Sequence, residues 1–74
     1  AASASLAALA ALRLAPGDRR VIAVASRQLT GNAPPVVVRD ALDVTTAALG
    51  DVAERWPISV LRARLRLALG DAEG

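Results

Sequence analysis

Proline and glycine residues divide this chain into short apolar segments. The first break follows residues 11–15, where Pro16 cannot continue a helix because it lacks an N–H and its ring clashes with the preceding turn. Gly17 lets the backbone leave the helix, and the carboxylate of Asp18 can accept hydrogen bonds from the first N–H groups of a new one. The segment therefore predicts the end of one helix, a short turn and the start of another.

The segment before this break predicts a helix that begins at Ser3 or Ser5 and ends at Leu14. Either serine can cap it. Large apolar residues then follow at helical spacing: Leu6, Leu9 and Leu12.

The segment after the break predicts a second helix from Arg19 to Leu29 or Thr30. Its apolar residues fall three or four positions apart, and Gly31 follows at a position typical of a glycine that closes a helix. A strand over residues 20–28 is the alternative, because several residues there are β-branched. Residues typical of helix ends, Asp18 at the start and Gly31 after the end, favour the helix.

Residues 35–55 predict either one helix from Pro35 to Arg55 or two helices that meet near residues 43–45. Pro35 suits the first position of a helix, and Gly50 weakens the middle by about 1 kcal/mol relative to alanine. The apolar residues recur at helical intervals: Val38, Leu42, Leu49, Val52 and Trp56. Because Trp56 continues this stripe, we expect it to fill the core, with Pro57 ending the element.

The last segment predicts a helix from Pro57 to Leu69 that stops at Gly70. One apolar stripe should face the core, while Val60 and Leu67 fall on the opposite side. A helix that is apolar on two sides is usually covered on two sides, which points to a partner. A row of arginines flanks the buried stripe: Arg55, Arg62 and Arg66. A strand over residues 58–69 is the alternative, because leucine and arginine alternate there.

The composition argues against an enzyme. The chain contains no Cys, no His, no Lys and no Tyr, so the usual nucleophiles, general bases and thiolate or imidazole metal ligands are missing. Two carboxylate pairs, Asp40 with Asp43 and Asp51 with Glu54, could each share a helix face, but we interpret both as solvated. We therefore expect no catalytic residue, no metal and no cofactor.

Three segments resemble parts of the tetratricopeptide repeat. The run from Ala11 to Pro16 resembles the end of a second repeat helix, with Ala4 and Ala8 at the small packing positions before it. The run from Leu61 to Asp71 resembles the first helix and turn of a further repeat. The run from Trp56 to Gly70 also resembles the degenerate helical repeats of large LuxR-type regulators. In the repeat that would follow Pro16, the large, packing, small and packing positions of the first helix would be Ile22, Ala25, Ser26 and Leu29. The resemblance implies stacked helical hairpins that bind a peptide or a partner helix.

A second resemblance, to a helix-turn-helix, covers residues 38–55. The apolar pattern fits, with Asp43 at the turn. Arg39 stands where a small residue is usual, and the reading face from Thr45 to Glu54 carries acids and no base. A helix that enters a groove lined with phosphates normally carries positive charge, so DNA binding is the alternative rather than the main interpretation.

We therefore predict an all-α domain of four or five short helices in antiparallel hairpins, with an α/β fold as the alternative. It is one small domain or part of a longer helical-repeat protein. We predict that the protein is cytoplasmic and that its function is non-enzymatic protein–protein interaction. The expected partner is another protein or a second copy of the chain, and no membrane association is expected. The residues expected to bind that partner are Arg55, Val60, Arg62, Arg66 and Leu67.

Overall fold

The protein is all-α over the range that its computed structural model describes, residues 2–73, with side chains described from residue 3 to residue 70. No strand occurs in this range, so the all-α prediction is confirmed, and the strand alternatives at 20–28 and 58–69 are wrong. The described helices are α1 (Ala2–Leu14), α2 (Arg19–Leu29), α3 (Pro35–Ala48) and α4 (Trp56–Glu73).

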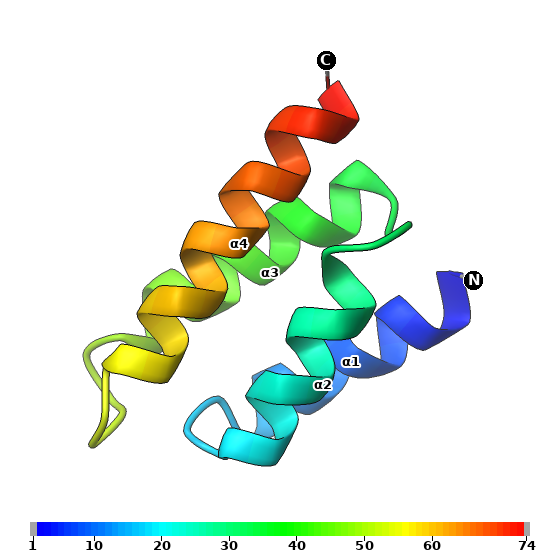
Figure 1. Cartoon of the computed structure of the whole chain (residues 1–74). Coiled ribbons are helices and arrows are strands. Elements are labelled where there is room, and N and C mark those ends of the chain that lie inside the picture. Colours follow the sequence, from blue (N-terminus) through cyan, green and yellow to red (C-terminus); the bar gives the residue numbers. More distant parts are fainter. Residues whose placement is uncertain (1, 74) are drawn as a thin grey trace.

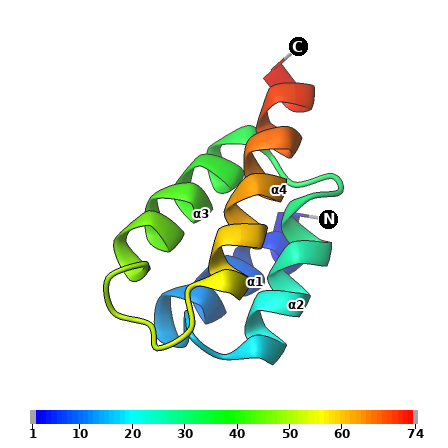
Figure 2. The same cartoon turned by 60° about the vertical axis from the view of Figure 1, so that its left-hand side comes forward.

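The helices form two hairpins around one core. α1 contacts α2 and α3 contacts α4, while the hairpins meet through α2 with α4 and α1 with α3. Figures 1 and 2 show α3 and α4 lying side by side and running in opposite directions, with α2 against the other side of α4. The body measures 33 × 22 × 16 Å. Among the described residues, α4 packs side by side with α2 and α3, and the side of α4 that faces away from them is left uncovered by the other helices.

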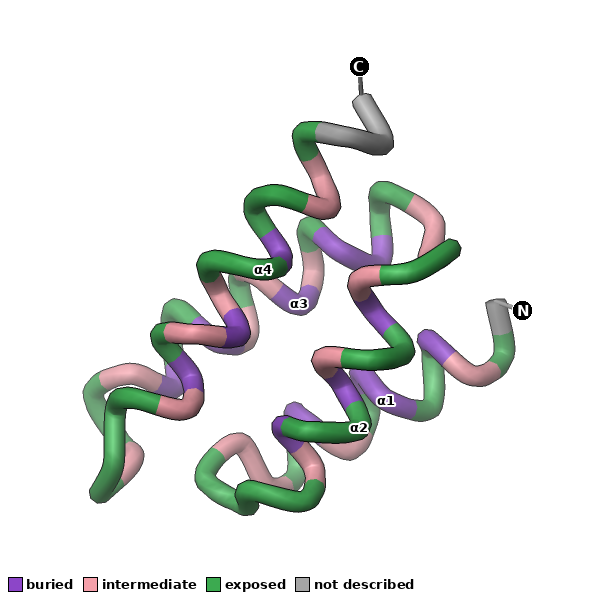
Figure 3. The backbone as a smooth tube through the Cα atoms, viewed as in Figure 1, coloured by how far each residue is buried: buried purple, intermediate pink, exposed green. Residues whose placement is uncertain are grey.

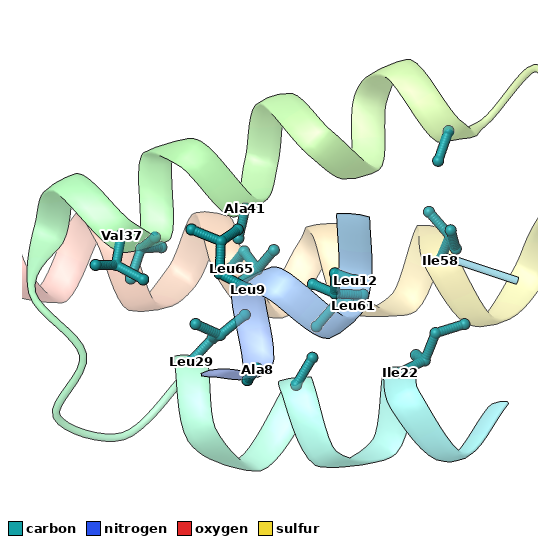
Figure 4. Packing of buried hydrophobic residues seen from close by; sticks show 13 residues of the cluster. Ala8, Leu9, Leu12, Ile22, Leu29, Val37, Ala41, Ile58, Leu61 and Leu65 are labelled. Carbon is teal, nitrogen blue, oxygen red and sulfur yellow. The ribbon is translucent and has the colours of Figure 1, made fainter. Parts of the chain in front are cut away.

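The core is built from leucines, valines, isoleucines and alanines contributed by all four helices (Figure 4). Ala25 and Ala41 are completely buried, and such small side chains allow neighbouring helices to approach closely. Each fully buried leucine contributes about 1.5–3 kcal/mol relative to an exposed one. The core residues are Ala8, Leu9, Leu12, Ile22, Ala25, Leu29, Val37, Val38, Ala41, Ala48, Ile58, Leu61 and Leu65.

The first turn forms as the sequence predicted. Asp18 caps α2, and its carboxylate accepts hydrogen bonds from the backbone N–H groups of Arg20 at 2.8 Å and Val21 at 3.4 Å. These bonds satisfy two of the N–H groups that a helix start leaves without a partner. The prediction that Pro35 opens the next helix is also confirmed.

Residues 35–55 differ from both predictions, because α3 is a single helix that ends at Ala48. The chain then turns through residues 49–55 before α4 begins. The carbonyl of Ala48 accepts the N–H of Asp51 at 2.9 Å and that of Val52 at 3.2 Å, which closes the helix end. Leu49 and Val52 still pack against the core from this turn, so their helical spacing did not require a helix.

The helix-turn-helix interpretation of this segment is wrong in its geometry. Asp43, the expected turn residue, lies inside the continuous helix α3. Thr45, expected on a DNA-reading face, is completely buried, and its hydroxyl donates to the carbonyl of Ala41 at 2.9 Å. No second helix follows until Trp56.

Both ends of α4 also differ from the predicted ones. The helix already includes Trp56, and it continues through Gly70 to Glu73. A glycine ends a helix most effectively in a left-handed conformation. The φ of Gly70 lies outside that region, so this residue acts as an ordinary helical position.

Candidate docking surface

The outward side of α4 carries an exposed apolar stripe. Trp56 is 77% exposed and Leu67 is 71% exposed, although both are large apolar side chains. Val60 and Ala63 lie between them at intervals of four, three and four residues, which places all four on one side of the helix. We call Trp56, Val60, Ala63 and Leu67 the outer stripe. Figure 3 shows that exposed positions recur along the outward side of α4, whereas buried ones face the other helices.

The prediction that Trp56 fills the core is wrong. The prediction placed Trp56 on the same helix face as Leu49 and Val52, which requires one continuous helix through residue 56. The turn at 49–55 interrupts the helix, so the spacing does not carry over. In α4 the inward positions belong to Ile58, Leu61 and Leu65, each at most 1% exposed. Trp56 falls on the opposite side of this helix and is therefore exposed.

A groove runs between α2 and α4 beside the outer stripe. It is an open depression of about 460 Å³. Trp56 and Val60 belong to both the stripe and the groove, so the two form one continuous surface. The groove is lined by Arg19, Ile22, Ala23, Ser26, Arg27, Trp56, Pro57, Val60, Leu61 and Arg64.

All charged side chains that line this α2–α4 groove are positive: Arg19, Arg27 and Arg64. The Nη1 group of Arg64 donates to the Ser26 hydroxyl at 3.2 Å, which holds this side chain across the groove. Arg19 forms an ion pair with Glu54 at one end of the groove. Arg27 and Arg64 have no acidic partner among the residues that the structure describes, so they are available to a negatively charged ligand.

The five residues expected to bind a partner do not all lie on this surface. Val60 lines the groove and Leu67 extends the outer stripe, while Arg66 is exposed on the far flank of that stripe. Arg55 lies in the turn before α4, where its Nε donates to the Leu49 carbonyl at 3.1 Å. Arg62 is half-buried on the side of α4 away from the groove.

Arg62 has a further distinguishing feature. Its Nε is buried and has no hydrogen-bond partner in the described part of the chain. An arginine can cover apolar surface with its aliphatic portion while its charged end reaches water. Residues 62 and 64 are two positions apart, or about 200° around a helix, so Arg62 and Arg64 project from opposite sides of α4.

Trp56, Arg27 and Arg64 are among the contributors to the surface that were not predicted from the sequence. The spacing of residues 56, 60, 63 and 67 was a usable signal, because intervals of four, three and four define a helix seam. Arg27 could not be found this way, since it reaches the groove from α2 through tertiary packing. The outer stripe of α4 could thus be predicted from the sequence, whereas the contribution of Arg27 could not.

A second set of exposed apolar side chains lies on α1. Leu14 is 87% exposed and Leu6 is 53% exposed. Arg13 is the one charged residue in α1. The exposed leucines of α1 therefore have few charged neighbours that would select a partner by charge. The groove, in contrast, is lined by three arginines.

The described residues contain no group of three or more acidic, histidine or cysteine side chains placed to hold a metal ion. In the carboxylate pair Asp51 and Glu54, the carboxylate of Glu54 forms an ion pair with Arg19.

None of the helices in the described range is long and apolar enough to cross a membrane. Comparison of the chain with protein-family models, curated proteins and solved structures finds no match.

Proposed function

We propose that this chain is a non-enzymatic docking module that binds another protein through the outer stripe of α4 and the adjoining α2–α4 groove. The observation that carries the proposal is the exposure of Trp56 and Leu67 on one side of a helix whose opposite side packs against α2 and α3. Contiguous exposed apolar surface with charged neighbours is typical of interaction sites. Tryptophan and arginine are the residue types most enriched among those that dominate binding energy.

The resemblance to peptide-binding helical repeats stays a prediction and agrees with this proposal. The groove also has the form that one recurring mode of recognition requires, in which an amphipathic helix lays its apolar side into a groove. Apolar anchors of such a ligand would contact Val60 and the floor formed by Ile22 and Leu61.

A display library of random 18-residue peptides tests the proposal. Peptides are selected on the 74-residue chain and then measured on a double variant, Trp56→Ser with Leu67→Ser, whose folding is verified by circular dichroism. We expect most selected peptides to lose at least tenfold in affinity for the variant. A control variant, Leu14→Ser, changes an even more exposed leucine on α1 and should leave binding unchanged. Peptides that bind all three proteins equally would contradict the proposal.

A further inference from the structure

We infer that the occupant of this surface is an acidic amphipathic helix of a different protein. The inference rests on the proposed docking function and specifies the chemistry of the ligand. It follows from the spacing of the outer stripe, from the charge on both of its flanks, and from what a second copy would place opposite it.

The outer stripe fits a helix laid alongside α4. Trp56 and Leu67 are eleven residues apart, which is about 16 Å along a helix at 1.5 Å per residue. Their spacing through Val60 and Ala63 matches the alternation of three and four residues by which two helices pack along a shared seam. Ala63 leaves room at the centre of the seam, so a large apolar residue of the ligand fits opposite it. A ligand helix of about three turns would cover the stripe from one end to the other.

Positive charge borders the stripe on both sides. Residues 64 and 66 are two positions apart in α4, so Arg64 and Arg66 project on opposite flanks of the stripe. Arg27 adds a third positive charge from the far wall of the groove. No Asp or Glu occurs anywhere in residues 56–70. A ligand helix with Asp or Glu on both sides of its apolar seam would therefore find a cationic partner on each flank.

A second copy of the chain is a poor occupant for the same reason. A two-fold symmetric pair places the same surface on both sides of the interface. The arginines of the groove lining and of segment 56–70 would then face one another, and Glu54, the carboxylate beside the groove, is already paired with Arg19. Like charges across an interface oppose association. The arrangement therefore selects a ligand of opposite charge.

Three synthetic helical peptides test this inference. They share one leucine seam at heptad a and d positions and differ only at the flanking positions, which are all Glu, all Gln or all Lys. None contains tryptophan, so Trp56 of the protein reports binding through its fluorescence. In low salt we expect the Glu peptide to bind at least tenfold more tightly than the Gln peptide, and the Lys peptide to bind most weakly. Because exposed charges are screened by salt, the differences should shrink at 0.5 M NaCl.

Single arginine variants separate the effect of the groove-side arginines from that of net charge alone. Arg27→Gln and Arg64→Gln should each weaken binding of the Glu peptide about threefold and leave the Gln peptide unaffected. The matched control is Arg13→Gln, which makes the same change in net charge on α1, a helix that contributes no residue to the groove lining. It should change the affinity less than twofold. Equal losses for all three variants would show that only net charge matters and would overturn the inference.

The other outcomes distinguish this inference from the proposed function. Equal binding of the three peptides would overturn the acidic ligand and leave the docking surface standing. If no peptide binds and the protein forms dimers that Leu67→Ser abolishes, the occupant is a second copy and the inference is wrong. If no peptide binds and the protein stays monomeric in sedimentation, both the inference and the docking function fail.

Discussion

Replacing Trp56 with alanine should leave the fold nearly intact, whereas Leu61→Ala in the same helix should remove much of its stability. About three quarters of the Trp56 side chain is exposed. With ~250 Å² for a buried tryptophan and ~25 cal/mol per Å², the covered quarter contributes at most about 1.5 kcal/mol. This value is an upper bound, because unfolded chains also cover part of their apolar surface. We expect a loss near 0.5–1 kcal/mol.

Leu61 is the matched control for that substitution, since it is 1% exposed and packs in the core. Truncation of a buried leucine to alanine typically costs about 2.7–5 kcal/mol, because transfer free energy is lost and a cavity remains. Urea unfolding followed by far-UV circular dichroism measures both variants without relying on tryptophan fluorescence. A loss above 3 kcal/mol for Trp56→Ala, or equal losses for the two variants, would show that Trp56 belongs to the core after all.

Three further substitutions test individual features of the fold. Gly70→Ala should raise the free energy of unfolding by about 0.5–1 kcal/mol, because Gly70 is helical and an added Cβ meets nothing within 4 Å. If chemical denaturation instead gave a lower free energy of unfolding, Gly70 would be a glycine that ends the helix. Asp18→Ala should lower it by about 1 kcal/mol through loss of the α2 cap, and an unchanged urea midpoint would exclude that role. Glu54→Gln should change it by less than about 0.5 kcal/mol, because the ion pair with Arg19 is largely exposed; a thermal shift of many degrees would contradict this.

Local signals were sufficient for the starts of α2 and α3 and for much of the core. Asp18 and Pro35 mark the beginnings of α2 and α3 through chemistry that depends only on adjacent residues. Ile22, Ala25 and Leu29 share a helix face, and all three are buried. Such features are fixed by spacing of three or four residues and need no knowledge of the tertiary structure.

The errors arose where the chain keeps an apolar spacing without keeping a helix. Leu49 and Val52 pack on the core from a turn, which reproduces helical intervals and hides the end of α3 at Ala48. That turn resets the phase of the next helix, so Trp56 points outward instead of inward. Gly70 misled for a different reason, since glycine can occupy a helix when nothing requires it to leave.

The partner surface was half predictable. Val60 and Leu67 were identified because they fall opposite the buried stripe of their own helix. Arg64 was missed in favour of Arg62, although the two project from opposite sides of α4. Only the packing of α2 against α4 shows which flank borders a groove and brings Arg27 to it.

Quenching of Trp56 fluorescence by acrylamide, with and without the Glu-flanked peptide, is the decisive measurement for the docking surface. In the free chain Trp56 should be quenched nearly as efficiently as a tryptophan in a short unfolded peptide, because it is 77% exposed. Saturation with the peptide should protect it strongly, since the ligand covers the outer stripe. Strong protection in the free chain, or unchanged quenching when the peptide is bound, would contradict the account.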